Sequence, residues 1–194
     1  MKIIETKVFQ YDELDWRAQE RARNWYAEGI EPDLDYVLEA AVTAGDLLGI
    51  SLKAKDIQYE VGWSQGCGAG FSGTYKFQPA AIDRVKAEFP EDTSLLLMAD
   101  QLEYIQGKLA QRSDTELGEH LTASIYCSRR GYGLDVSTDY EWADEDLESI
   151  FGDFAHWIYC RLQAELEYQY SQEVVEDNIR ANEYTFTETG QRWG

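Results

Sequence analysis

Long apolar runs are missing from this chain of 194 residues. No segment approaches the ~18 consecutive apolar residues that a transmembrane helix requires. The first residues, Met1 to Glu5, also lack the apolar run of a secretory signal peptide. We therefore expect a cytoplasmic protein without a membrane partner.

Cysteine and histidine are scarce. The three cysteines, Cys67, Cys127 and Cys160, are an odd number at wide spacing, which indicates reduced, buried thiols rather than a disulfide framework. Neither Cys-x-x-Cys nor His-x-x-x-His spacing occurs, so His120 and His156 complete no metal site with them. Pairing Cys67 with either histidine leaves a catalytic base without a third, orienting group. The sequence therefore predicts no metal, no cofactor and no enzymatic activity.

Basic residues are outnumbered, with 17 Lys and Arg against 37 Asp and Glu and a formal net charge of −20. Such a charge repels nucleic acid and anionic membranes, so direct binding of nucleic acid is not expected. A partner with a basic surface is easier to accommodate. Hydrophobic residues make up 44% of the chain and aromatic residues 13%, which is enough for a core and excludes a disordered acidic tail.

Local periodicity predicts alternating strands and helices. Period-two patterns indicate strands at residues 2–10, 50–54, 57–63, 71–77, 120–128 and 134–138, and a last edge strand at 184–187. Apolar residues at three-to-four spacing indicate helices from Asp12 or Asp15 to Gly29, from Pro32 to Gly49, from Pro79 to Phe89, and over residues 95–109 and 144–182. We expect an α+β fold in a single domain, residues 1–194. Its antiparallel sheet of β-hairpins packs against several helices, including a long acidic C-terminal helix with a break expected near Gly152 or Ser171.

Glycines recur through residues 63–73, between two predicted strands. Glycine permits positive φ and lets several amide N–H groups converge on one anion, so this turn is a candidate ligand site. The other interpretation is a twisted hairpin with bulges. A Walker loop or a dinucleotide fingerprint would require a helix directly afterwards, and here a strand follows.

A second turn follows the strand at 120–128 and carries two arginines. Arg129 and Arg130 can recognise an anion, with Tyr132 stacking beside it, or they can pair with surface carboxylates. If the two hairpins are neighbours in the sheet, both turns can lie at one end of it and build a shared pocket, which is a hypothesis. The candidate ligand residues are Trp63, Ser64, Gln65, Gly66, Cys67, Gly68, Arg129, Arg130 and Tyr132.

Residues 144–183 concentrate the negative charge, with eleven acidic residues against two arginines and a net charge of −9. Carboxylates along a helix can imitate a phosphate backbone, dock a basic protein, or simply keep the chain soluble. The candidate partner-binding residues are Asp144, Glu145, Asp146, Glu148, Asp153, Glu165 and Glu167.

Three stretches carry a family resemblance. The residues from Tyr11 to Tyr26, the segment Gly62 to Gly73 and the ending Asn182 to Gly190 resemble small phage and bacterial proteins of the type labelled antitoxin of a toxin–antitoxin stability system. The middle segment is similar to that family's Trp-Ser-Gln-Gly-Asp-Gly-Ala-Ser-Phe signature, but Cys67 stands where Asp is usual and Gly70 where Ser is usual. The resemblance implies neutralisation of a toxin or host defence by binding, in the host cytoplasm, and supplies no catalytic residues.

Two hypotheses follow. The first is a non-enzymatic phage or prophage protein that neutralises a bacterial toxin or defence factor by protein–protein contact, with its acidic surface acting as a nucleic-acid mimic in one version. The alternative is a protein that sequesters a nucleotide signal between the Gly-rich turn and the Arg129-Arg130 turn. The sequence leaves the partner's identity and any homo-oligomer open.

Overall fold

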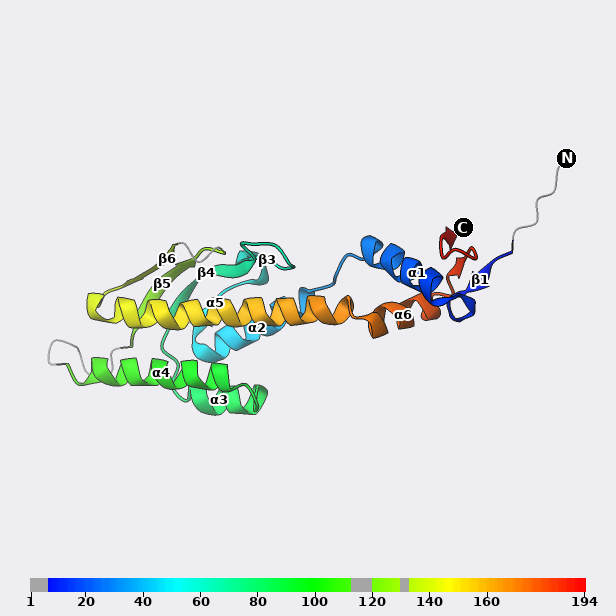
Figure 1. Cartoon of the computed structure of the whole chain (residues 1–194). Coiled ribbons are helices and arrows are strands. Elements are labelled where there is room, and N and C mark those ends of the chain that lie inside the picture. The colour runs from blue at the N-terminus through cyan, green and yellow to red at the C-terminus, as the bar shows by residue number, and fades with distance from the viewer. Residues whose placement is uncertain (1–6, 113–119, 130–132) are drawn as a thin grey trace. The chain divides into compact units, whose positions relative to one another are not determined.

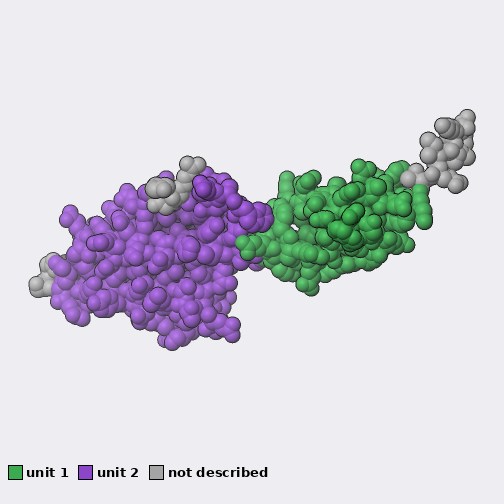
Figure 2. Space-filling model, viewed as in Figure 1, with its two compact units in different colours: residues 1–33, 165–194 green, residues 34–164 purple. Residues whose placement is uncertain are grey.

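The computed structural model describes residues 7–112, 120–129 and 133–194. The contacts within the chain divide it into two compact units, one made of residues 1–33 and 165–194 (unit 1) and one of residues 34–164 (unit 2), which Figure 2 shows in two colours. Each unit has its own cluster of buried apolar side chains. Helices and antiparallel sheets make this an α+β fold, as the sequence predicts. The single-domain prediction stays a prediction, because two compact units can form one domain or two.

Unit 2 contains a five-stranded antiparallel sheet. Its strands are β2 (Ile50–Ser51), β3 (Ile57–Glu60), β4 (Gly68–Lys76), β5 (Thr122–Cys127) and β6 (Leu134–Thr138). The central strand β4 pairs with β2 and β3 along one edge and with β5 along the other, and β5 pairs with β6. Burial alternates along β5, with Ala123, Ile125 and Cys127 buried and Tyr126 exposed. The sheet therefore has one face covered by helices and one open to solvent.

Helices cover that face in two layers. They are α2 (Asp35–Leu48), α3 (Ala81–Glu88), α4 (Thr93–Ala110) and α5 (Glu141–Gln169), and Figure 1 shows the part of α5 in unit 2 between the sheet and α4. Phe154 of α5 packs edge-on against Phe71 of β4, with ring centroids 5.4 Å apart. On its other side α5 meets α4, where Asp146 pairs with Lys108 at 3.0 Å. A helix held on both sides explains why most of its apolar residues are fully buried.

Unit 1 joins the two ends of the chain. Its helices are α1 (Trp16–Gly29) and α6 (Gln172–Ala181), and its strands β1 (Phe9–Gln10), β7 (Thr185–Phe186) and β8 (Arg192–Trp193) form a small antiparallel sheet in the order β1-β7-β8. Tyr11, Ile179 and Phe186 belong to its buried core.

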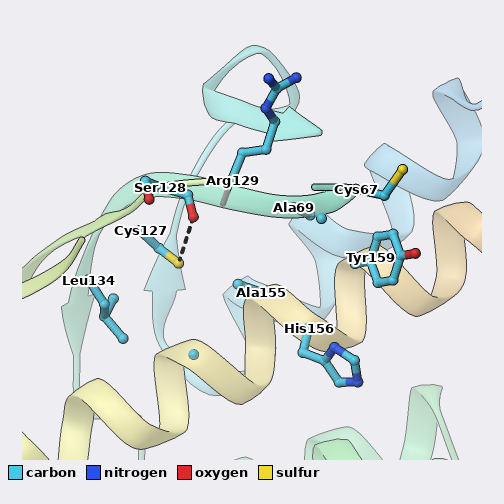
Figure 3. A pocket seen from close by; sticks show the side chains of 11 residues that line it. Cys67, Ala69, Cys127, Ser128, Arg129, Leu134, Ala155, His156 and Tyr159 are labelled. Carbon is cyan, nitrogen blue, oxygen red and sulfur yellow. Dashed lines mark hydrogen bonds between the residues drawn. The ribbon is translucent and has the colours of Figure 1, made fainter. Parts of the chain in front are cut away.

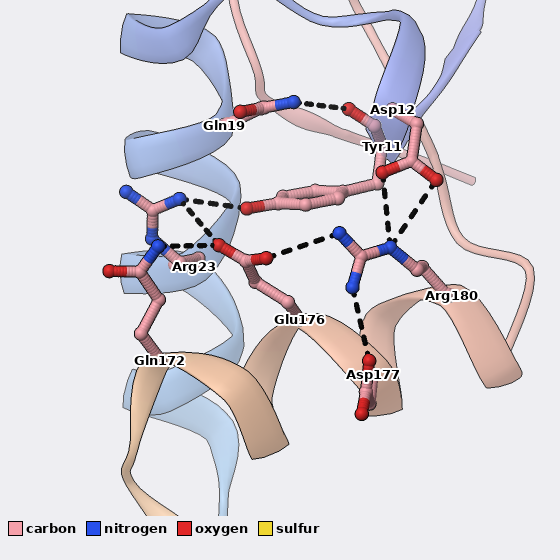
Figure 4. A network of polar contacts seen from close by, with 8 residues as sticks. All are labelled: Tyr11, Asp12, Gln19, Arg23, Gln172, Glu176, Asp177 and Arg180. Carbon is pink, nitrogen blue, oxygen red and sulfur yellow. Dashed lines mark hydrogen bonds and ion pairs between the residues drawn. The ribbon is translucent and has the colours of Figure 1, made fainter.

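A polar network borders this core (Figure 4). Arg23 of α1 donates to the Tyr11 hydroxyl at 2.8 Å and to Glu176 of α6 at 3.0 Å. Arg180 donates to Asp12 at 3.0 Å and also pairs with Glu176. The network links α1, α6 and the segment after β1, which lie far apart in the sequence.

Several predicted boundaries hold because local chemistry sets them. The Asp15 carboxylate caps α1 by accepting from the backbone N–H of Ala18 at 2.8 Å. A break at Ser171 separates α5 from α6, and the Ser171 hydroxyl caps α6, whereas Gly152 continues its helix. Among the residues that the structure describes, none of the helices has the length and apolar character to span a membrane.

Other predictions are wrong. The helices expected to open at Pro32 and Pro79 begin at Asp35 and Ala81. Pro32 lies in irregular chain before its helix, and Pro79 lies in a turn that continues through Ala80, whose φ is +58°. The strand predicted at 184–187 is the central strand β7 of a second sheet instead of an edge strand, so the described residues form two sheets where one was expected. For the predicted strand at 2–10, residues 1–6 lie outside the described residues.

Candidate functional site

A pocket of about 420 Å³ lies in unit 2 where the start of β4, the end of β5 and the middle of α5 meet (Figure 3). We call it the β4–α5 pocket. Its lining is Cys67, Gly68, Ala69, Cys127, Ser128, Arg129, Leu134, Gly152, Ala155, His156 and Tyr159. The end of the Gly-rich turn and the start of the Arg129 turn therefore line one pocket, which is the arrangement hypothesised for neighbouring hairpins.

Two glycines of the Gly-rich segment lie within a strand and not in the predicted turn. Gly68 and Gly70 belong to β4, and a Cβ added to Gly68 would lie 2.4 Å from the Arg129 carbonyl oxygen. At Gly70 a Cβ would lie 2.2 Å from the Cys127 carbonyl oxygen. Since both neighbours are backbone atoms, these glycines permit close approach of two strands. The predicted turn at 64–70 is therefore wrong at its C-terminal end, and Gly66, with φ +95°, lies in the actual turn.

Arg129 does not direct its charge into the pocket. Figure 3 shows its side chain extending to the opposite side of the sheet from α5. There Nη1 pairs with a carboxylate oxygen of Glu60 at 2.7 Å, and both side chains are partly exposed. Such a pair contributes ~0–1 kcal/mol to stability. Arg129 thus lines the pocket with its backbone while Glu60 balances its guanidinium.

The three thiols differ in their surroundings, and all three are free. Cys127 is buried, and burial raises the pKa of its thiol. Cys67 is half-buried, with its Sγ 3.4 Å from the Ser64 hydroxyl, whereas Cys160 is exposed, with its Sγ 3.4 Å from His156 Nε2. The prediction of buried thiols is therefore wrong for Cys160, because it lies on the solvent side of α5. Across residues 7–112, 120–129 and 133–194, no three His, Cys, Asp or Glu side chains cluster as metal ligands.

Alkylation should separate the three thiols. We expect iodoacetamide to modify Cys160 and Cys67 in the native chain and to modify Cys127 ~10-fold or more slowly, because that thiol needs a local opening of the structure to react. Peptide mass spectrometry over time measures the three rates. Equal rates in the native chain would contradict the burial of Cys127, and equal rates in denaturant are the control.

A second feature of unit 2 is an exposed face formed by α4 and α5. On α4, Leu97, Gln101, Tyr104 and Lys108 recur at three-to-four spacing, and Leu97 and Tyr104 are 57% and 66% exposed. On α5, Asp146, Ser149 and Asp153 follow the same spacing and are exposed. A hollow of about 310 Å³ lies between the helices and is lined by Gln101, Tyr104, Ile105, Lys108, Asp146, Ser149 and Ile150. We call these two stripes, with the exposed Asp100 beside them, the α4–α5 face.

Comparison with known proteins places most of the chain in one family. Residues 34–172 match the family described as Domain of unknown function (DUF8835). The chain belongs to this family. The DUF8835 match contains all of unit 2, and with it both the β4–α5 pocket and the α4–α5 face. No curated protein and no solved structure matches the chain.

The predicted ligand residues are only partly brought together in the DUF8835 domain. Cys67, Gly68 and Arg129 line the β4–α5 pocket, while Trp63, Ser64, Gln65 and Gly66 are not part of its lining. Trp63 is 76% exposed. Arg130 and Tyr132 lie outside the described residues. Sequence reasoning missed the α5 wall, although the small residues Gly152 and Ala155, three apart on one helix, are a signal of close packing.

The predicted partner-binding acids fall into two groups. Glu145, Asp146, Asp153 and Glu167 are exposed, and Asp144, Glu148 and Glu165 are half-buried. Asp144 accepts a hydrogen bond from the Thr138 hydroxyl at 2.8 Å, and Glu165 accepts one from Gln169 at 2.7 Å. Sequence reasoning missed the exposed side chains Leu97 and Tyr104 of the α4–α5 face, because helix spacing identified only the buried stripe of α4.

Proposed function

We propose that this chain is a non-enzymatic binding protein of phage or prophage type, which neutralises a bacterial toxin or defence factor by protein–protein contact through the α4–α5 face. The observation that carries the proposal is the placement of two large exposed side chains, Leu97 and Tyr104, among carboxylates. Tyrosine is enriched among the residues that dominate the energy of protein interfaces. A monomer gains nothing from exposing both side chains on one helix face.

The α4–α5 face carries exposed carboxylates, which favour a partner of positive charge. Asp100 lies one turn from both Leu97 and Tyr104 on α4, and Asp153 is exposed on α5. Lys108 is paired with Asp146, so it does not offset these carboxylates. Together with a formal net charge of −20, this supports a partner with a basic surface, such as the nucleic-acid-binding groove of a toxin or defence nuclease.

A rescue experiment tests the proposal. Bacterial strains that each carry one toxin or one phage-defence system are challenged with and without the expressed chain, and growth or phage plating is counted. We expect about tenfold or greater rescue in at least one strain. The double variant Leu97→Ser/Tyr104→Ser should abolish that rescue and weaken binding to the purified partner by about 30-fold, as loss of an interface anchor does.

Matched variants distinguish loss of binding through the α4–α5 face from a general effect of replacing exposed side chains. Tyr36 on α2 is also exposed, at 55%, so Tyr36→Ser should leave rescue and affinity unchanged. Asp100→Asn/Asp153→Asn should weaken binding mainly through a slower association rate. Full rescue by the Leu97/Tyr104 double variant would contradict this face, and an absence of rescue in every strain would contradict the function.

A second candidate function is the binding of a small ligand in the β4–α5 pocket, because Cys67 and Gly68 of one predicted turn and Arg129 of the other line it. The orientation of Arg129 toward Glu60 weighs against a phosphate group as its main anchor. If a nucleotide signal binds there, it should slow the alkylation of Cys67 while leaving Cys160 unaffected. Unchanged Cys67 rates across a panel of nucleotides would count against this function.

A further inference from the structure

Unit 1 contains a pocket of its own, separate from the sites of unit 2. It has a volume of about 370 Å³ and is lined by Trp25, Tyr26, Gly29, Ile30, Glu31 and Tyr184. Trp25 and Tyr26 lie near the end of α1, and Tyr184 directly precedes β7. We call it the aromatic pocket. It combines three aromatic rings, one carboxylate and the end of a helix.

The three rings are held in a fixed arrangement. Trp25 and Tyr184 meet at an interplanar angle of 89° with centroids 5.3 Å apart. Tyr26 lies 6.3 Å from Trp25 and 6.2 Å from Tyr184. Trp25 also packs edge-on against the buried Phe186, which anchors it to the core of unit 1. Rings that meet at such angles present π faces in more than one direction, as a binding site for a rounded cation requires.

The electrostatics of this pocket favour a positive ligand. Helix α1 ends at Gly29, so its carbonyl end, which carries partial negative charge, contributes to the wall. The last turn of α1 contains no basic residue, and Glu28 in that turn is exposed. Glu31 adds a carboxylate to the lining itself. The helix end and both carboxylates would repel an anionic ligand.

The same rings already hold a cation inside the fold. The Arg192 guanidinium lies over the Tyr184 ring at 4.8 Å and over the Trp25 ring at 5.8 Å, and it donates to the Thr185 carbonyl at 3.2 Å. Arg192 is not part of the pocket lining, so it does not fill the space beside Tyr26 and Glu31. Its positive charge opposes a second cation, but Glu28 and Glu31 offset that repulsion.

We propose that the aromatic pocket binds an alkylated ammonium head group, of the kind carried by choline, betaines and N-methylated lysine. Such a group is weakly hydrated, so aromatic faces compensate its desolvation better than they compensate that of a primary ammonium. The π faces of Trp25, Tyr26 and Tyr184 surround the methyl groups, and Glu31 with the end of α1 balances the charge. This site is independent of the function proposed for the α4–α5 face, since every residue that lines it belongs to unit 1.

Titration of the full chain tests this site with matched probes. Choline and tetramethylammonium are compared with 3,3-dimethylbutanol, which has the shape of choline without its charge, by calorimetry and by NMR of the tryptophan indole N–H signals. We expect both cations to bind at least about tenfold more tightly than the neutral alcohol. Equal affinity for choline and the alcohol, or no binding of either cation, would overturn the proposal.

Four variants locate the binding. Tyr184→Leu should weaken choline binding by about tenfold or more and Glu31→Gln by about threefold, while Tyr184→Phe should retain it because the ring remains. Trp16→Leu is the control, since Trp16 is 67% exposed on the same helix but does not line the pocket. Glu31 is exposed, so Glu31→Gln tests the site even if Tyr184→Leu unfolds unit 1. Equal loss from Trp16→Leu would overturn the assignment to this pocket.

The source of the head group is a separate arm of the experiment. A peptide with trimethyllysine and a peptide with unmodified lysine are titrated alongside choline. Tighter binding of the trimethyllysine peptide than of choline assigns the site to a modified side chain, and the reverse order assigns it to a small metabolite. The strain experiment distinguishes this proposal from the function proposed for the α4–α5 face. Glu31→Gln should rescue as well as the parent chain, because loss of the aromatic pocket leaves the α4–α5 face intact.

Discussion

Gly70→Ala is expected to lower the free energy of unfolding of unit 2 by about 2–3 kcal/mol, although it adds a single methyl group. A Cβ at this position would lie 2.2 Å from the Cys127 carbonyl oxygen, 2.5 Å from the Arg129 nitrogen and 2.5 Å from the Ser128 carbonyl carbon. All three atoms belong to the backbone, so no side chain can rotate away. The methyl group can be accommodated only if the end of β5 moves away from β4.

Urea unfolding of the full chain measures this effect, with Gly107→Ala as the matched control. Gly107 lies within α4, and a Cβ added to it meets nothing within 4 Å. Because alanine favours a helix over glycine, the control should gain about 1 kcal/mol. Similar stabilities for Gly70→Ala and the parent chain would show that β4 and β5 separate at little cost. Unfolding of Gly70→Ser measures the cost of serine at this position, which is the residue usual in the signature that the chain resembles.

The Gly-rich segment shows where prediction from sequence stops. A period-two pattern identifies a strand through its side chains, and glycines at alternate positions remove that signal, so residues 64–70 were expected to form a turn. Gly68 and Gly70 are strand residues because they pair with Glu60 and Gln58 of β3. What requires glycine at both positions is the close approach of backbone atoms of Cys127 and Arg129, more than fifty positions further along the chain. The helices, in contrast, were predicted within a few residues, because apolar spacing and caps such as Asp15 and Ser171 are local.

The division into two units was also not predicted, because it depends on contacts between segments that are far apart in the sequence. The core of unit 1 joins Tyr11 and Ala22 from the start of the chain to Ile179 and Phe186 from its end. Each segment alone has an ordinary amphipathic pattern, which does not indicate the segment against which it packs. For the site, adjacency of the hairpins suggested the hypothesis of a shared pocket, and of the proposed ligand residues Cys67, Gly68 and Arg129 line one. The direction of the Arg129 side chain depends on Glu60 of β3, which sequence spacing does not reveal.

Asp92→Ala is expected to cost about 2–4 kcal/mol of stability at neutral pH. The Asp92 side chain is only 7% exposed and has two roles. It caps α4 by accepting from the Leu95 N–H at 3.1 Å, and it accepts from Trp157 Nε1 at 2.8 Å while pairing with Arg161 of α5. Removing the carboxylate ends the cap and leaves the indole N–H of the buried Trp157 without this acceptor.

This contribution should depend on pH in a defined direction. Burial disfavours the charged form of Asp92, but the hydrogen bonds from Trp157, Arg161 and Leu95 outweigh it, so the pKa of this carboxyl lies below its ordinary value of 3.8. A group with a lowered pKa in the folded state stabilises the fold above its unfolded pKa, and that stability is lost as the pH falls through the folded value. The difference in stability between the parent and Asp92→Asn should therefore be constant near neutrality and shrink below about pH 4.

Thermal and urea unfolding from pH 7 to pH 3 measures both effects, and Asp12→Ala is the control. Asp12 also pairs with an arginine, Arg180, but its side chain is 66% exposed, so its loss should cost less than about 1 kcal/mol. A loss for Asp92→Ala as small as for Asp12→Ala would mean that the Asp92 carboxylate contributes little to holding α4 on α5. If the loss is large, Asp92 fixes α4 against α5. In that case Asp92→Ala should weaken rescue through the α4–α5 face while leaving choline binding in unit 1 unchanged.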